Sequence, residues 1–230
     1  MVQGVETQTV PYIAPQRRWI PLIEVILGAF IVIGHNVYHI VPNEVPILFA
    51  LFWISPRLLR GKWDLSELTR PHSWWQTIGM AILATAVLHL GAQLLVQPMA
   101  EHFWPQPQHV SSVIKMAAMG WKTAALSLAV IWTFAAFGEE LGYRGYLIKC
   151  AAALGGGSKL AYVVAMLYVS VLFGCGHFFK GPAGVVASIW SGMVLGAVFL
   201  LSRRNLWACI LTHGLADTVA VVALFLGWAN

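Results

Sequence analysis

Residues 131–147 read IWTFAAFGEELGYRGYL. The run is apolar for most of its length, and yet it contains two adjacent acids, Glu139 and Glu140, followed by Arg144. An ionisable side chain inside a membrane span costs at least about 2.5–3.5 kcal/mol, so such residues usually mark a functional site or a pathway. The stretch therefore predicts a membrane helix that carries a polar site.

The rest of the chain has the composition of a membrane protein. Of its 230 residues, 59% are hydrophobic and only 10% are charged, whereas soluble domains carry about 25% charged residues. The excess of Lys and Arg over Asp and Glu forms no basic cluster interleaved with aromatics, so we expect membrane lipid as a partner and no nucleic acid. Cys150, Cys175 and Cys209 lie in apolar runs without CxxC spacing, which predicts buried thiols rather than disulfides or metal ligands.

Apolar segments of about 20 residues are long enough to cross a bilayer. We expect spans near 19–41, 75–98, 119–140, 159–179, 182–202 and 205–228, and a tight span or re-entrant segment at 44–58. The amphipathic segment 99–118 is expected at the interface. The prediction is an all-α polytopic bundle of about seven to eight transmembrane helices, the eighth arising if the last run breaks at Gly214. Residues 1–18 form a polar tail and 19–230 a single membrane domain.

Most lysines and arginines fall on the same side as the N-terminus if the chain crosses seven times. Because cytoplasmic loops are enriched in these residues, we expect a cytoplasmic N-terminus. The expected location is a multi-pass position in a bacterial inner membrane or, in a eukaryote, in the endoplasmic reticulum. The sequence gives no oligomeric state.

The helix that contains the two glutamates presents a length problem. A straight helix from 119 to 153 would be about 50 Å long, much longer than the bilayer core. We expect it to tilt, to break near Gly138, Gly142 or Gly145, or to project into water.

Glu140 and Arg144 are four residues apart, so they share a helical face and can form an ion pair. That pair could be purely structural. Glu139 points about 100° away from Glu140 and has no such partner. An unpaired carboxylate in an apolar run is the best candidate for a general base.

Two later spans supply histidines. FGCGH (173–177) places His177 on one face with Phe173, and LTHGLAD (211–217) places His213 on one face with Asp217. A lone intramembrane histidine could merely link two helices, but polar residues on three spans predict a site built from facing helices. His35 and His39 form a further pair, either as a second metal site or, as we favour, as a cap at the end of the first span.

Three motifs resemble those of the CAAX-protease and bacteriocin-processing family, CPBP or Abi. EELGYR (139–144) is similar to its EExxxR motif, FGCGH to FxxxH, and HGLAD (213–217) to HxxxN/D. They occur in the family's order within about residues 120–220. The resemblance implies an intramembrane endopeptidase, similar to the type II CAAX prenyl endopeptidases, that acts on protein or peptide substrates of the membrane. Asp217 stands where prenyl-protease members tend to carry Asn, which leaves open whether the substrates are prenylated CAAX proteins.

The resemblance implies six catalytic residues: Glu139, Glu140, Arg144, His177, His213 and Asp217. Glu139 would activate a water molecule, and the histidines and Asp217 would orient that water, hold the oxyanion or bind a metal. The expected cofactor is a divalent metal, zinc, held by Glu139, His177 and His213, as in a metalloprotease, although the chain has no HExxH motif. A non-catalytic membrane scaffold or bacteriocin-immunity protein, or a proton-coupled transporter, remains an alternative.

Overall fold

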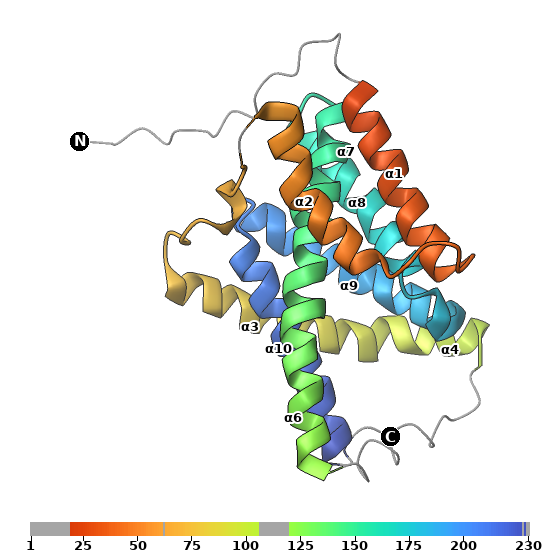
Figure 1. Cartoon of the computed structure of the whole chain (residues 1–230). Coiled ribbons are helices and arrows are strands. Elements are labelled where there is room, and N and C mark those ends of the chain that lie inside the picture. The colour runs from red at the N-terminus through yellow and green to blue at the C-terminus, as the bar shows by residue number, and fades with distance from the viewer. Residues whose placement is uncertain (1–18, 62, 106–119, 227, 229–230) are drawn as a thin grey trace.

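The computed structural model describes residues 19–61, 63–105, 120–226 and 228, and within these ranges the chain is all-helical (Figure 1). The α-helices are α1 (Trp19–Asn36), α2 (Glu44–Arg60), α3 (Trp74–Gly91), α4 (Gln97–Phe103), α6 (Gly120–Val130), α7 (Ile148–Leu154), α8 (Lys159–Cys175), α9 (Gly181–Leu201) and α10 (Leu206–Phe225). Wider π-helical turns form η3 (Ala92–Val96), η4 (Ile131–Glu139) and η5 (Leu141–Leu147), and 3-10 turns form η2 (Ser66–Leu68) and η6 (Phe178–Lys180). The predicted polar tail, 1–18, lies outside the described residues.

Five helices are long and apolar enough to cross a membrane: Trp19–Asn36, Trp74–Phe103, Gly120–Leu154, Phe178–Leu201 and Leu206–Phe225. A sixth apolar helix, Lys159–Cys175, is shorter. These helices confirm an all-α membrane protein. The predicted total of seven to eight crossings stays a prediction, because α2 and α8 have only 17 residues each.

Side-chain caps explain where several helices begin. The Asn43 side chain accepts a hydrogen bond from the backbone N–H of Val45 at the start of α2. Ser158 and Asn205 act in the same way at the starts of α8 and α10. Such caps satisfy N–H groups that the first helical turn leaves unpaired.

Two expectations concern where helices end. The first residues of the segment 99–118 continue the helix that runs from Trp74 to Phe103, and residues 106–119 lie outside the described part, so the interfacial position of this segment stays a prediction. The alternative of a break at Gly214 is excluded, because α10 is continuous. Gly214 permits close packing instead: a Cβ there would come within 2.5 Å of the Trp132 ring.

The helix that carries the two glutamates is also continuous, from Gly120 to Leu154. The predicted break at its glycines is absent, and wide π-helical turns occupy that region instead. Figure 1 shows that α6, the first part of this long helix, extends beyond α1, α2 and α8. In this extension α6 runs beside α10. π-Helical turns within α-helices are frequent at functional sites.

Three glycines bring α2 into close contact with this long helix. A Cβ on any of them would approach an α2 side chain within 3 Å: Gly138 would meet Val45 at 2.9 Å, Gly142 would meet Leu48 at 2.7 Å, and Gly145 would meet Phe52 at 2.7 Å. Small residues allow membrane helices to approach this closely. The three contacts fix the register of α2 and place its first residue, Glu44, one position before the residue that packs on Gly138.

Candidate active site

The three motifs meet in the interior of the bundle. η4 and η5 carry the two glutamates and Arg144, the turn after α8 carries His177, and the middle of α10 carries His213 and Asp217. α10 is held in place by α3: Thr85 donates a hydrogen bond to the carbonyl of Thr212 at 3.3 Å, and the His89 ring contacts the carbonyl of Ala216 at 3.2 Å. These two contacts flank His213 and bring it to the level of the glutamates.

Glu140 is the centre of the polar network. Its side chain is fully buried, and one oxygen, Oε1, accepts hydrogen bonds from Arg144 Nη1 at 2.9 Å and from His213 Nδ1 at 2.7 Å. Arg144, 1% exposed, also donates to the carbonyl of Gly192 at 3.3 Å and lies 4.6 Å above the Phe173 ring. The predicted pair is therefore confirmed, and it is part of a network that links three helices.

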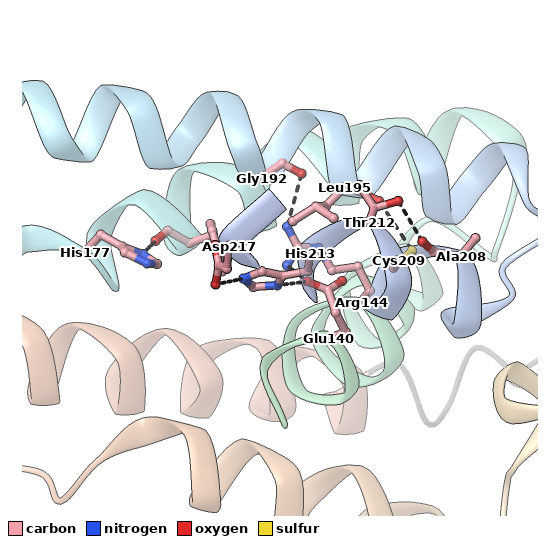
Figure 2. A network of polar contacts seen from close by, with 11 residues as sticks. Glu140, Arg144, His177, Gly192, Leu195, Ala208, Cys209, Thr212, His213 and Asp217 are labelled. Atoms are coloured by element: carbon pink, nitrogen blue, oxygen red, sulfur yellow. Dashed lines mark hydrogen bonds and ion pairs between the residues drawn. The ribbon is translucent and has the colours of Figure 1, made fainter. Parts of the chain in front are cut away.

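His213 lies between two carboxylates, as Figure 2 shows. Its Nδ1 binds Glu140, and its Nε2 lies 3.6 Å from Asp217 Oδ2. A carboxylate that faces each ring nitrogen favours the doubly protonated imidazolium. Asp217 is the more open end of the network, since 38% of its side chain is exposed. The predicted proximity of His213 and Asp217 is confirmed.

His177 stands to one side of this network, beyond Asp217 in Figure 2. Its Nδ1 lies 2.9 Å from the carbonyl of Phe173. A carbonyl can only accept, so Nδ1 carries the proton, and a neutral ring then has its lone pair on Nε2. Nε2 is thus available to accept a hydrogen bond from water.

The Phe173 ring connects the parts of the site. Its centroid lies 4.7 Å from that of His177, 5.0 Å from that of Tyr143 and 6.2 Å from that of His213. With Arg144 stacked on its face, the ring separates the buried ion pair from His177. These contacts give a physical reason for an aromatic residue four positions before the histidine.

Glu139 has surroundings that differ from those of Glu140. It is only partly buried, but its Oε2 is enclosed and has no hydrogen-bond partner among the described residues. The charged or titratable groups that interact electrostatically with its carboxylate include His213, Glu140, Arg144 and Asp217. An enclosed carboxylate oxygen without a partner is able to bind a water molecule or a substrate donor.

The predicted zinc ligands do not form a metal site in this arrangement. No group of three or more His, Cys, Asp or Glu within the described ranges is placed to hold a metal ion. His213 has a carboxylate at each ring nitrogen, so it would have to leave Glu140 or Asp217 before it could donate a lone pair. The donor set as arranged does not fit zinc.

Other predicted side chains lie outside the network. Asn36 donates to the carbonyl of Val32, and His35 contacts the carbonyl of Val41, as expected for residues that close the end of the first span. None of the three cysteines forms a disulfide; Cys150 and Cys209 are buried, as predicted, whereas Cys175 is half-buried. The sulfur of Cys150 lies 3.4 Å from Glu24 Oε2.

Sequence reasoning missed two polar residues next to the site, Glu44 and Tyr143. Glu44 looks like a loop residue in the sequence but is buried at the first turn of α2. Its only sequence signal is the helix cap at Asn43 that precedes it. Tyr143 follows Glu139 by four residues within the motif, and its ring is 1% exposed.

Comparison with known proteins agrees with this geometry. Residues 120–219 match the family described as type II CAAX prenyl endopeptidase Rce1-like. No curated protein and no solved structure matches the chain. The matched residues contain every residue of the polar network described above. Residues 120–219 therefore match an Rce1-like domain, which is consistent with the CPBP family.

Proposed function

We propose that the protein is an intramembrane endopeptidase that hydrolyses peptide bonds of membrane-associated proteins or peptides. The observation that carries the proposal is the contrast between the two glutamates. Glu140 Oε1 is held by Arg144 and His213, whereas Glu139 has no ion-pair or hydrogen-bond partner among the described residues; the other oxygen, Oε2, is enclosed and unpartnered in both glutamates. Prenylated CAAX-type proteins are the substrate class that the family suggests.

Glu139 acts as the general base. It takes a proton from a water molecule, and the resulting hydroxide attacks the carbonyl carbon of the scissile bond. A C–O bond forms, and the carbonyl π electrons move onto oxygen to give a tetrahedral oxyanion. When the C–N bond breaks, Glu139 returns the proton to the leaving amine. His177 Nε2 accepts a hydrogen bond from the other O–H of the water, which stays on the oxygen, and so orients the attack.

His213 is the group suited to stabilise the oxyanion. Its Nδ1–H is bound to Glu140 at 2.7 Å, but Nε2 lies 3.6 Å from Asp217, beyond hydrogen-bond distance, so an Nε2–H would be available to an oxyanion beside Asp217. A fixed positive donor at the place where negative charge develops is worth about 10²–10³ in rate. Glu140 and Arg144 act through His213 as positioning residues, because they hold its ring on α10 against the motif helix.

Two finer predictions belong to the same proposal. The N-terminus faces the cytoplasm of a bacterial inner membrane or of an endoplasmic reticulum membrane, and the chain crosses seven to eight times. Zinc, which the resemblance implied as the cofactor of a metalloprotease, has no part in this mechanism, because His213 would have to release a carboxylate before it could bind a metal. Site-directed accessibility labelling at each end of α1 would test the first of these.

The experiment is a cleavage assay with purified protein and membrane-associated peptides. Glu139→Gln removes the base but keeps the size of the side chain, so we expect its kcat to fall by about 10²–10⁴ with little change in thermal stability. Glu101→Gln, at an exposed position on α4, is the matched control and should cleave like the wild type. Full cleavage by Glu139→Gln would refute the mechanism and favour a scaffold or immunity role.

A further inference from the structure

Glu44 is a buried acid outside the region that matches the family. It is the first residue of α2 and is 7% exposed. Charged residues at this depth of burial are usually paired. The partners and neighbours of Glu44 therefore indicate what it could bind.

The neighbours of Glu44 belong to the candidate active site. Its Oε1 lies 3.7 Å, and the Tyr143 hydroxyl 2.7 Å, from the point where a Cβ on Gly176 would stand. Gly176 immediately precedes His177. On the other side, the Val45 side chain packs against Gly138, the residue before Glu139. Glu44 thus lies beside the turn that carries His177, and the next residue, Val45, packs beside the proposed general base.

The ion-pair partner of Glu44 among the described residues is His35, at 3.4 Å from Oε2. The N-terminus of α2, where Glu44 lies, adds only a partial positive charge. Because His35 Nδ1 faces the carbonyl of Val41, the contact with Glu44 is attractive only when a second proton is present on His35 or on Glu44.

We propose that Glu44 is a specificity-determining residue that binds a basic side chain of the substrate next to the scissile bond. The proposal rests on the protease function proposed above. A Lys or Arg side chain of a bound peptide would supply the counter-charge that the site lacks. A charge-assisted hydrogen bond to an enclosed carboxylate is stronger than one between neutral groups.

The test is a positional scan of a cleaved neutral peptide. Lys replaces one residue at a time on both sides of the scissile bond, and kcat/KM is measured with the purified wild-type protein. We expect one position at which Lys raises kcat/KM by about tenfold over a neutral isostere, and at which Glu lowers it. Glu44→Gln should abolish this difference while the neutral peptide is still cleaved, and Glu44→Lys should reverse it in favour of Glu.

Two further variants separate binding from folding. His35→Gln removes the competing partner, so the preference for Lys should be kept or increased. Glu24→Gln changes another half-buried acid, on α1, and should leave the preference intact. If the wild type shows no preference for Lys at any position, or if Glu44→Gln retains that preference, the proposal is wrong. Cleavage of the neutral peptide keeps this outcome distinct from a failure of the protease function itself.

Discussion

The buried ion pair between Glu140 and Arg144 can be broken by replacing either residue, and the structure predicts a different loss in the free energy of unfolding for each. In Glu140→Gln, the Arg144 guanidinium keeps only the Gly192 carbonyl and the Phe173 ring. An uncompensated buried charge typically costs about 3–5 kcal/mol. In Arg144→Met, Glu140 still binds His213 at 2.7 Å, which supplies a compensating proton, so we expect a loss of about 1–2 kcal/mol.

Thermal unfolding of the purified protein in detergent measures this difference. At about 2–4 °C per kcal/mol for a chain of this size, Glu140→Gln should lower Tm by about 6–20 °C and Arg144→Met by about 2–8 °C. The double variant removes both charges, so it should be more stable than Glu140→Gln alone. If Arg144→Met lowers Tm as much as Glu140→Gln, or if the double variant is the least stable of the three, Glu140 is not the shared partner of two cations.

Three other perturbations test separate parts of the structure. Gly142→Val places methyl groups where a Cβ alone would be 2.7 Å from Leu48, and this overpacking should cost about 1–3 kcal/mol and lower Tm, whereas Gly79→Val, with open space around it, should not. Burial raises the pKa of Asp64, but the Lys149 ammonium and hydrogen bonds from Ser66 and Lys149 outweigh it and hold that pKa at about 2. At pH values above 3.8, the usual pKa of this group, ionised Asp64 therefore contributes its full stabilisation, which is lost as the pH falls towards 2. Asp64→Asn should lower Tm at pH 6 and lessen the fall of Tm between pH 4 and pH 2. A strong chelator should leave cleavage by purified protein unchanged, since the described residues gather no three-ligand set; lost activity that zinc restores would show that the ligands rearrange to bind the predicted metal.

Interactions between residues close in sequence were predictable. The pairs Glu140–Arg144 and His213–Asp217 are each four residues apart on one helix, and helical geometry alone brings their side chains together. The length of the apolar runs likewise predicted an all-α membrane protein. These inferences need only the period of a helix and the thickness of a bilayer.

Interactions between distant segments were not predictable to the same extent. The bond from His213 to Glu140 joins residues 73 positions apart, and the order of three motifs predicted a shared site but not which glutamate the histidine would bind. For a related reason, the sequence could not choose among a tilt, a break at Gly138, Gly142 or Gly145, and a projection into water, of which the continuous helix excludes the break. Glycine in a helix permits either a bend or close packing, and only the neighbouring helix decides between them.

Here the neighbouring helix is α2, which brings residues from the N-terminal part of the chain next to the proposed active site. The contacts of Gly138, Gly142 and Gly145 allow α2 only one register along the long helix. A slip by one residue would remove Val45 from Gly138. That register is what buries Glu44 beside Tyr143 and the turn that holds His177. The proposed catalytic groups all lie within 120–219, but the carboxylate of Glu44, from outside this region, lies next to Gly176 in the turn that carries His177. Proteins that share the three motifs but differ in this helix should therefore share the reaction and differ in the substrate residue that they accept next to the scissile bond.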